Sequence, residues 1–326
     1  MALGEFDLIR LYFTRDVRRA VLGVGDDCAL LAPAPGMQLA TSSDMLVEGR
    51  HFLSTVAPRH LGHKALAVNL SDLAACGAKP LAFTLALAMP RADEAFLEGF
   101  SSGLYALADA CGCELVGGDT TQGPLNICIT VFGEVPPGEA LLRSGARAGD
   151  DLYVSGTVGD ARLALEAFRG TVKLDGDGFE RVRVAMELPQ PRIALGLALR
   201  GVATSAIDVS DGLLGDLGHI LRRSGVGATV EVDQVPCSDT LAGQPLALRR
   251  LCTLAGGDDY ELVFTAPPAR ADAVRGAARA AGVAATRIGR IDAAAGLRLV
   301  DAQGRDVADT FGSFDHFRAG GAEDAR

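Results

Sequence analysis

The chain has 326 residues, 48% of them hydrophobic and only 5% aromatic with no Trp, so its core has to be built mainly from Ala, Val, Leu and Ile. This length favours two domains. The net charge of −10, from 41 acidic and 31 basic residues, argues against nucleic acid as a partner, because phosphate binding needs a basic surface. No apolar run is long enough to predict a membrane span, and residues 1–13 lack the pattern of a signal peptide.

Seven cysteines are present, and none of them forms the C-x-x-C pair of a zinc or redox site. Cys111 and Cys113 come closest, and we interpret them as core thiols at the point where a helix passes into a strand. Free thiols and the lack of a leader pattern together predict a reducing, cytoplasmic location.

In chain order, residues 5–13 are predicted to form a short helix, and the segment GVGDDCA follows at residues 23–29. Its glycines begin like a dinucleotide-binding fingerprint, but Cys28 stands where the third glycine belongs, so we reject that interpretation. A tight turn that presents Asp26 and Asp27 fits the segment better.

A strand is predicted over residues 37–43, and it runs into Ser42, Ser43 and Asp44. Hydroxyl and carboxylate oxygens at the end of a strand are hard ligands that suit Mg²⁺. His51 follows in a predicted loop, where a lone histidine is either structural or part of a site.

The stretch 60–77 is predicted to form a helix that is hydrophobic on all sides and therefore buried. Asn69 and Asp72 lie in its middle and share a face. No Lys or Arg lies one turn away from Asp72, although a buried ionised carboxylate is costly without a cation beside it. Either Asp72 is a polar core or capping residue, or it faces a bound metal, and we favour the metal.

Strands are predicted over residues 81–88, 113–117 and 125–135, with an amphipathic helix over residues 92–110 between the first two. The strand at 113–117 is expected to end in the turn GGDT at residues 117–120. Long alternating strands among helices favour an α+β N-terminal domain with a mixed sheet over a purely parallel one.

The Pro- and Gly-rich segment 134–151 marks a domain boundary. We predict an N-terminal domain over residues 1–140, a C-terminal domain over 141–318 and a disordered tail over 319–326. In the C-terminal part, short strands alternate with helices, which predicts an α/β domain. The predicted strands are 152–155, 202–207, 228–232, 262–265 and segments within 287–300, and the predicted helices are 160–169, 191–200, 213–221, 241–254 and 269–281.

The predicted strand 202–207 leads into the segment IDVSDGL, immediately before a helix. An acidic residue at the start of a helix ordinarily caps it or interacts with its dipole, and this explains one of Asp208 and Asp211 but not both.

Aspartates recur beside glycine, serine or a predicted strand end at positions 26, 27, 44, 72, 119, 208, 211, 258 and 259. If these aspartates lie close together in the fold, they repel one another unless divalent cations neutralise them. A polyphosphate such as ATP is the substrate that most commonly binds together with several Mg²⁺ ions. The sequence contains neither a P-loop nor the protein-kinase motifs, so metals and backbone amides would have to hold the phosphates. Arg143 is either a phosphate partner or a solvated linker charge.

A set of motifs, in order over about residues 4–317, resembles the thiamine-monophosphate kinase family: GVGDDCA, SSDMLVEGRHF, KALAVNLSDLAACGAKP, GGDTT, RSGARAGD, IDVSDGL and GGDDYEL. That family belongs to a superfamily similar to aminoimidazole ribonucleotide synthetase. The resemblance implies an α/β (α+β) two-domain fold, in which an N-terminal mixed or antiparallel sheet pairs with its copy in a homodimer and a C-terminal α/β domain follows.

The resemblance also implies roles for individual residues. Those expected to be catalytic are Asp44, Asp72, Asp119 and Asp208. Those expected to bind Mg²⁺ are Asp27, Ser42, Ser43, Asp44, Asp72, Asp119, Asp208 and Asp211. Gly118, Asp119, Arg143 and Ser210 are expected to bind ATP, and His51, Asp258 and Phe314 to bind the thiamine phosphate. Compared with the commonest family pattern, Ser43 replaces Thr and Asp258 replaces Glu, which shortens the reach of that carboxylate by one methylene.

The expected reaction is therefore phosphorylation of thiamine monophosphate by ATP, with several Mg²⁺ ions and without a nucleic-acid or membrane partner. The acceptor phosphate is already an anion near neutral pH, because the second pKa of a phosphate monoester is about 6, so no general base is needed. Two alternatives remain at this point: a non-catalytic sensor that binds thiamine phosphates with Mg²⁺, and another ATP-using enzyme of the same superfamily.

Overall fold

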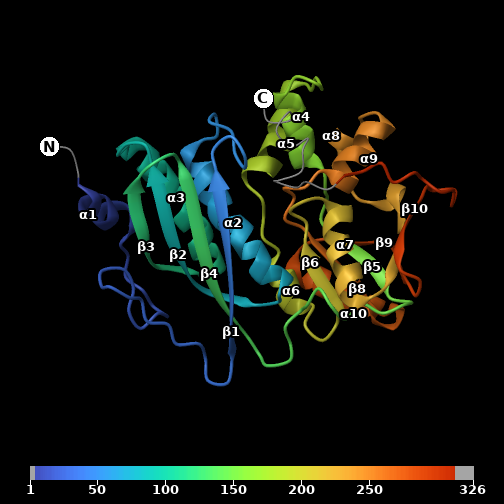
Figure 1. Ribbon diagram of the computed structural model, residues 1–326, viewed down its shortest axis with the longest axis horizontal. Helices are drawn as coiled ribbons and strands as arrows, with labels where there is room; N and C mark the ends of the chain where they lie inside the picture. Colours follow the sequence, from blue (N-terminus) through green and yellow to red (C-terminus); the bar gives the residue numbers. More distant parts are fainter. Residues whose placement is uncertain (1–3, 313–326) are drawn as a thin grey trace. The chain divides into compact units, whose positions relative to one another are not determined.

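The computed structural model describes residues 4–312, which form two compact units (Figure 1). The N-terminal unit contains the described residues up to Leu73 together with Ala78–Gly138. The C-terminal unit contains Ala74–Gly77 and the described chain from Glu139 onward. Two predictions, the role of Phe314 and the disordered tail 319–326, lie outside the described residues.

The N-terminal unit is built on a four-stranded sheet with the strand order β1-β4-β2-β3. Strands β2 and β3 are parallel and the other neighbours are antiparallel, which confirms the predicted mixed sheet. Its elements are α1 (Glu5–Leu8), the π-helix η1 (Ile9–Phe13), β1 (Gln38–Val47), α2 (Pro58–Ala75), β2 (Lys79–Met89), α3 (Glu94–Cys111), β3 (Glu114–Gln122) and β4 (Asn126–Val135).

Helices α2 and α3 cover one face of this sheet (Figure 1). The two helices approach closely at Gly62 and Gly103, where a Cβ atom would overlap the carbonyl oxygens of Phe100 and Arg59 respectively. Helix α2 is buried over most of its length, as its all-round hydrophobic sequence predicts. The residues of α2 that point at β1 are therefore held rigidly.

The C-terminal unit contains a six-stranded sheet with the order β10-β7-β9-β5-β8-β6, in which only the β7–β10 pair is parallel. Its strands are β5 (Asp151–Ser155), β6 (Ser205–Asp208), β7 (Gly227–Glu231), β8 (Leu262–Ala266), β9 (Ala285–Asp292) and β10 (Gly296–Val300). Its helices are α4 (Asp160–Phe168), α5 (Gly176–Glu187), α6 (Ile193–Ala198), α7 (Leu213–Ser224), α8 (Asp239–Ala242), α9 (Leu246–Ala255) and α10 (Ala271–Ala281), with 3₁₀ turns η2 (Val232–Gln234) and η3 (Pro268–Arg270).

Both faces of this second sheet carry hydrophobic clusters. On one face, Leu217 and Ile220 of α7 pack with Val230 and Ile288. On the other, Phe264 belongs to a cluster with residues of α6 and α10. Strand β6 ends at Asp208 and α7 begins at Leu213, so one predicted aspartate is the last residue of the strand and another, Asp211, lies in the loop between the two elements.

The structure corrects three details of the sequence interpretation. Strand β1 continues to Val47, so Asp44 lies inside the strand and not at its end. Gly118 and Asp119 lie inside β3 and not in a turn. Helix α5 was not predicted, because its hydrophobic residues are sparse, and it begins where the Asp175 carboxylate caps the Gly178 amide at 2.6 Å. Within residues 4–312, no helix is both long and apolar enough to cross a membrane.

Candidate active site

In the N-terminal unit, β1 and α2 bring several of the predicted residues together. The Ser42 hydroxyl donates a hydrogen bond to the Asp72 carboxylate at 2.5 Å, and the backbone amide of Asp44 donates to the Asn69 side-chain oxygen at 3.0 Å. The Asn69 amide group in turn donates to the carbonyl of Ala65 at 3.0 Å. Asn69 is fully buried and lies one helical turn from Asp72 in α2, and its role is to fix the backbone of β1 at Asp44.

Asp72 is half-buried and its only interaction among the described residues is the bond from Ser42. No Lys, Arg or His lies within ion-pair distance of it in that part of the chain. A partly desolvated carboxylate without a cation is costly, which disfavours a purely structural role. Carboxylate and hydroxyl oxygens are the donors that Mg²⁺ prefers, so the residues present here fit that ion.

Asp119 lies on the opposite face of the same sheet. In β3 it is paired with Ala86 of β2, and both residues line a shallow hollow of about 380 Å³ together with Met45 and Cys128. Gly118 has a φ of 144° and passes so close to Leu85 that a Cβ atom would overlap the Leu85 carbonyl oxygen. The structure therefore does not bring the Asp119 carboxylate beside Asp72.

Three further predicted residues of this unit have defined surroundings. The Ser43 hydroxyl lies 2.9 Å from the Thr130 hydroxyl and donates to the Ile129 carbonyl at 3.2 Å. His51 Nδ1 accepts the Val47 amide at 2.9 Å, which closes the turn after β1 and leaves the other ring nitrogen as the proton carrier of a neutral imidazole. Asp27 is exposed, and its amide bonds to the side chain of the preceding aspartate at 2.9 Å.

In the C-terminal unit, the loop between β6 and α7 is organised by a residue that the sequence interpretation missed. Asp216, in α7, accepts the backbone amides of Ser210 and Asp211 at 3.0 Å each. The N-cap of α7 is Gly212, so neither of the two predicted aspartates caps this helix with its side chain. Burial raises the pKa of Asp216 to about 7, and the neighbouring Asp211 carboxylate adds to the rise.

Asp216 could have been found from the helix pattern. It lies on the same helical face as Leu213, Leu217 and Ile220, which are buried, so it is a charged residue on the hydrophobic side of an amphipathic helix. Such a residue needs a hydrogen-bond donor nearby.

A second loop of this unit, Gly256–Glu261, packs beside the first. The amide of Asp258 donates to the Ser210 carbonyl at 2.8 Å, and the amide of Tyr260 donates to the Val209 carbonyl at 2.9 Å. Asp258 and Tyr260 have φ values of 63° and 53°, in the left-handed region that non-glycine residues rarely adopt. The structure thus brings Ser210 and Asp258, predicted to contact different substrates, into direct backbone contact.

The end of this second loop is held by a buried ion pair. Arg192 donates to both carboxylate oxygens of Glu261, with its Nε at 2.7 Å, and Ser155 donates to the same carboxylate. Glu261 is 4% exposed, so these bonds satisfy a carboxylate that would otherwise be costly to bury. This pairing cannot be predicted from the sequence, because Arg192 and Glu261 lie far apart along the chain.

Arg143 is exposed and lies in the loop before β5. Its carbonyl accepts the hydroxyl of Ser224 at 3.3 Å, and the same hydroxyl accepts the amides of Gly145 and Ala146 at 3.2 Å each. The positive charge of Arg143 acts to lower the pKa of Asp216. The guanidinium group therefore lies near the β6–α7 loop.

The predicted metal ligands are divided between the two units. Asp27, Ser42, Ser43, Asp44, Asp72 and Asp119 belong to the N-terminal unit, whereas Asp208 and Asp211 belong to the C-terminal unit. Asp208 is buried at the end of β6, as predicted, and Asp211 is exposed. Among residues 4–312, no three His, Cys, Asp or Glu side chains form a group that could hold a metal by themselves, and the ligand set stays a prediction.

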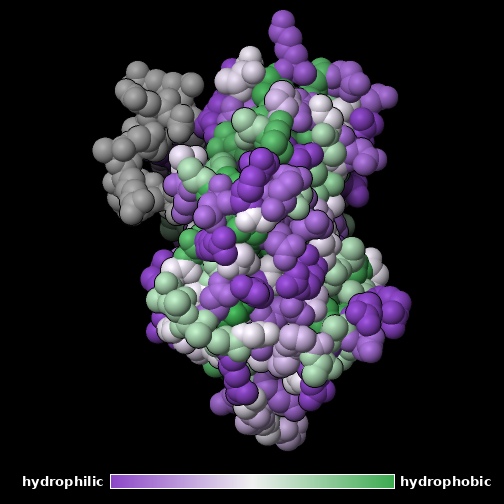
Figure 2. Space-filling view, turned by 90° about the vertical axis from the view of Figure 1, so that its right-hand side faces the viewer, coloured by the Kyte–Doolittle hydropathy of each residue, from purple (hydrophilic) through white to green (hydrophobic). Residues whose placement is uncertain are grey.

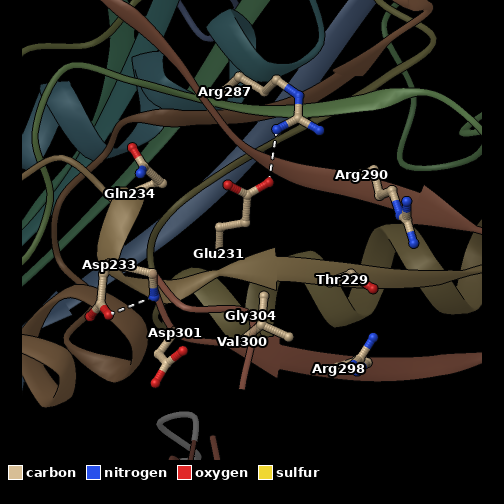
Figure 3. A pocket seen from close by; sticks show the side chains of 11 residues that line it. Thr229, Glu231, Asp233, Gln234, Arg287, Arg290, Arg298, Val300, Asp301 and Gly304 are labelled. Carbon is tan, nitrogen blue, oxygen red and sulfur yellow. Dashed lines mark hydrogen bonds and ion pairs between the residues drawn. The ribbon is translucent and has the colours of Figure 1, made fainter. Parts of the chain in front are cut away.

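A different hollow, of about 390 Å³, lies over β7, β9 and β10 of the second sheet and contains none of the predicted site residues (Figure 3). Arg287 of β9 donates to Glu231 of β7 across it at 2.8 Å. Asp233 accepts the Ala302 amide at its rim at 3.1 Å. Arg287 and Glu231 pair with each other, and the other arginines and carboxylates of the hollow form ion pairs with residues just outside it, so its charges are already compensated.

Two family descriptions match the chain: AIR synthase related protein, N-terminal domain, over residues 25–135, and AIR synthase related protein, C-terminal domain, over residues 147–302. The curated thiamine-monophosphate kinase of Salmonella typhimurium is 46% identical, covering 97% of this chain and 99% of its own length. The chain belongs to the thiamine-monophosphate kinase family. The corresponding protein of Escherichia coli K12 is 45% identical with the same coverage.

Solved structures agree with this family. Thiamine-monophosphate kinase from Stenotrophomonas maltophilia K279a has a TM-score of 0.82 at 45% identity and covers 86% of this chain and 91% of its own. AaThiL complexed with AMPPCP and TMP has a TM-score of 0.76 at 29% identity and covers 88% of this chain and 89% of its own. Escherichia coli HypE, a hydrogenase maturation protein, has a TM-score of 0.75 at 21% identity, which shows a shared fold alone.

These findings confirm the family and the two-domain fold that the motifs predicted. The prediction of an ATP-dependent kinase is confirmed over the alternative of a non-catalytic sensor. Four of the seven motifs lie in the two places described above, along β1 and α2 and in the paired loops of the C-terminal unit; the other three lie before β1, in β3 and before β5.

Proposed function

We propose that this protein transfers the terminal phosphoryl group of ATP directly to the phosphate of thiamine monophosphate, giving thiamine diphosphate and ADP. The observation that carries the proposal is the Ser42–Asp72 and Asn69–Asp44 arrangement, present in a chain that matches thiamine-monophosphate kinases over nearly its whole length. The related AaThiL was solved with an ATP analogue and TMP, which supports the same pair of substrates here.

In this proposal, several Mg²⁺ ions are held by oxygen ligands, and Asp72 and Asp119, on opposite faces of the N-terminal sheet, serve different ions. The proposed ligands of this unit are the carboxylates of Asp27, Asp44, Asp72 and Asp119 and the hydroxyls of Ser42 and Ser43. Asp208 and Asp211 are the corresponding ligands of the C-terminal unit. Bound Mg²⁺ neutralises phosphate charge, so that two anions can approach each other. Asn69 lies one helical turn from Asp72 in α2 and binds the β1 backbone at Asp44, so it ties together the two elements that carry these carboxylates.

The remaining proposed roles concern the substrates. Gly118, Asp119, Arg143 and Ser210 contact ATP, with the exposed guanidinium of Arg143 pairing with phosphate oxygens. His51, Asp258 and Phe314 contact thiamine monophosphate, where the Asp258 carboxylate complements the cationic thiazolium ring. The chain needs no side chain to remove a proton, because the acceptor phosphate is already ionised near its second pKa of about 6.

We also propose a homodimer formed through the open face of the N-terminal sheet. On β1, an edge strand, Leu39 is 49% exposed and Met45 is 52% exposed, and Met45 lines the hollow on that face. By contrast, the face of the C-terminal unit in Figure 2 is mostly hydrophilic, with hydrophobic residues in small groups. All seven cysteines are free thiols, which supports the proposal of a reducing, cytoplasmic location.

The test of the proposed function is ADP release by the full chain with Mg²⁺ and ATP, with thiamine monophosphate, thiamine or an aminoimidazole precursor added in turn. We expect release only with thiamine monophosphate, and loss of release when EDTA removes Mg²⁺. Release with free thiamine alone would overturn the proposal, because a hydroxyl acceptor needs a base that the chain has not been assigned.

A further inference from the structure

One buried carboxylate oxygen, of Asp216, fixes the backbone of the loop between β6 and α7. Both amides that bond to Asp216, those of Ser210 and Asp211, meet the same atom, Oδ2, at 3.0 Å. Asp216 is 3% exposed and lies at the hydrophobic side of α7, so this oxygen has little access to water. The two backbone amides are therefore occupied and cannot donate to a phosphate.

Backbone hydrogen bonds also join the β6–α7 loop to the Gly256–Glu261 loop. The carbonyl of Ser210 accepts the Asp258 amide at 2.8 Å, and Val209 exchanges two backbone bonds, its amide with Glu261 at 2.8 Å and its carbonyl with Tyr260 at 2.9 Å. The peptide groups on both sides of Ser210 thus have fixed partners. What the loop leaves accessible is the half-buried side chain of Ser210 and the exposed side chain of Asp211.

We infer that Asp216 is a positioning residue for the kinase reaction. Its carboxylate fixes the backbone of Ser210 and Asp211 and, through the bond between Ser210 and Asp258, holds the second loop in the same arrangement. This inference rests on the proposed function, which assigns Ser210 to ATP, Asp211 to Mg²⁺ and Asp258 to thiamine monophosphate. Asp216 touches none of these ligands itself.

The property of Asp216 that holds the loop is its acceptor oxygen rather than its charge. Because a single oxygen accepts both amides, the amide oxygen of an Asn at this position can accept them too, whereas Ala offers no acceptor. Removing the acceptor leaves two loop amides to find water or to turn toward another group, and the loop loses its fixed conformation. The positioning role therefore predicts loss in Asp216→Ala and rescue in Asp216→Asn.

The test compares Asp216→Ala and Asp216→Asn with the wild-type full chain. For Asp216→Ala we expect the KM for ATP to rise about tenfold or more and kcat to fall. The KM for thiamine monophosphate should rise less. Asp216 binds the first loop directly through two hydrogen bonds, whereas it acts on Asp258 only indirectly, through the bond between Ser210 and Asp258. For Asp216→Asn we expect both constants within about threefold of wild type.

Two readouts do not depend on turnover. Amide hydrogen exchange of peptides covering residues 208–217 and 256–262 should become faster in Asp216→Ala and stay near wild type in Asp216→Asn. Binding of the fluorescent nucleotide mant-ATP should weaken in parallel with the KM for ATP. If Asp216→Ala does not fold, Asp216→Glu replaces it, because it moves the oxygen by one methylene while keeping the charge, and we expect the same direction of change.

Asp233→Ala is the matched control. Asp233 belongs to the same unit and also accepts a backbone amide, that of Ala302 at 3.1 Å, but it lies at the hollow of Figure 3, among none of the proposed site residues. It should lower thermal stability without changing the KM for ATP or the exchange of residues 208–217. Equal kinetic changes in the control and in Asp216→Ala would overturn the inference, as would unchanged exchange and nucleotide binding in Asp216→Ala.

Failure of the proposed function gives a different result. If wild type releases no ADP with thiamine monophosphate, while Asp216→Ala still exchanges faster at residues 208–217 and binds mant-ATP more weakly, the substrate assignment fails and the positioning role stands. If Asp216→Asn is as defective as Asp216→Ala, the charge and not the acceptor oxygen is responsible, and the inference as stated is wrong.

Discussion

Asp72 gives the sharpest test of the metal assignment. Its carboxylate is half-buried, accepts the Ser42 hydroxyl at 2.5 Å and has no ion-pair partner among the described residues. In Asp72→Asn the amide oxygen can still accept that hydroxyl, and the variant loses only a negative charge that no cation offsets. Without Mg²⁺, the free energy of unfolding should therefore stay within about 1 kcal/mol of wild type or rise.

With Mg²⁺ present, wild type and Asp72→Asn should differ in stability. An ion present at about 100 times its Kd stabilises the native state by ~2.7 kcal/mol, which corresponds to roughly 5–10 °C in Tm for a unit of this size. Asp72→Asn should lose most of that rise and should turn over at least about 100-fold more slowly than wild type.

The assay is thermal unfolding in EDTA and in Mg²⁺ with ATP, together with ADP release. Asp109→Asn is the control, because Asp109 is an exposed carboxylate of α3 in the same unit, paired with Arg15 at 3.2 Å. It should behave as wild type in both assays. A full Mg²⁺-dependent rise in Tm together with normal turnover in Asp72→Asn would refute the reasoning.

Three further predictions follow from the structure. The Arg250 guanidinium holds the pKa of Asp233 below its ordinary 3.8, so the pair stabilises the fold above that pH and the stabilisation is lost as pH falls through the lower folded-state pKa. Asp233→Asn should therefore be about 1.5–3 kcal/mol less stable than wild type in urea at pH 7, with a difference that shrinks below pH 4; a constant difference would contradict the pairing. Gly103→Ala should cost about 1–3 kcal/mol in the same urea assay, because the new Cβ meets backbone, and an unchanged midpoint would show that the α2–α3 contact is looser than described. Met45→Asp should shift the chain toward monomer in size-exclusion chromatography across a concentration series, and an unchanged profile would exclude this face from the proposed dimer.

The sequence predicts most of the fold because the elements differ clearly in hydrophobic pattern. Helix α2 is hydrophobic on all sides, and strand β4 alternates, so their type and approximate bounds follow from periodicity. Helix α5 lacks such a signal, since its hydrophobic residues are few and its start depends on a cap at Asp175. Local pattern therefore finds the core elements and misses one whose stability depends on packing against α4 and α8.

The candidate site is predictable in composition and only partly in geometry. The sequence indicates that Asn69 and Asp72 share a helical face, and both do contact β1. It cannot indicate which face of the sheet Asp119 takes, because that depends on the register of β3 against β2, which shifts at an irregularity beside Phe83. A one-residue shift moves a side chain to the other face, so the position of Asp119 requires the structure.

The backbone of the Gly256–Glu261 loop gives an independent reason to regard its side chains as functional. Asp258 and Tyr260 adopt left-handed conformations, each at a cost of about 1–3 kcal/mol that a glycine would avoid. At the neighbouring position the chain does use glycine: Gly257 has a φ of 71°, and a Cβ there would lie 2.6 Å from the Ser210 carbonyl oxygen. The chain uses glycine where only backbone geometry is at stake, whereas at Asp258 it keeps a carboxylate despite the strain. This strain supports the proposal that the Asp258 carboxylate contacts the substrate.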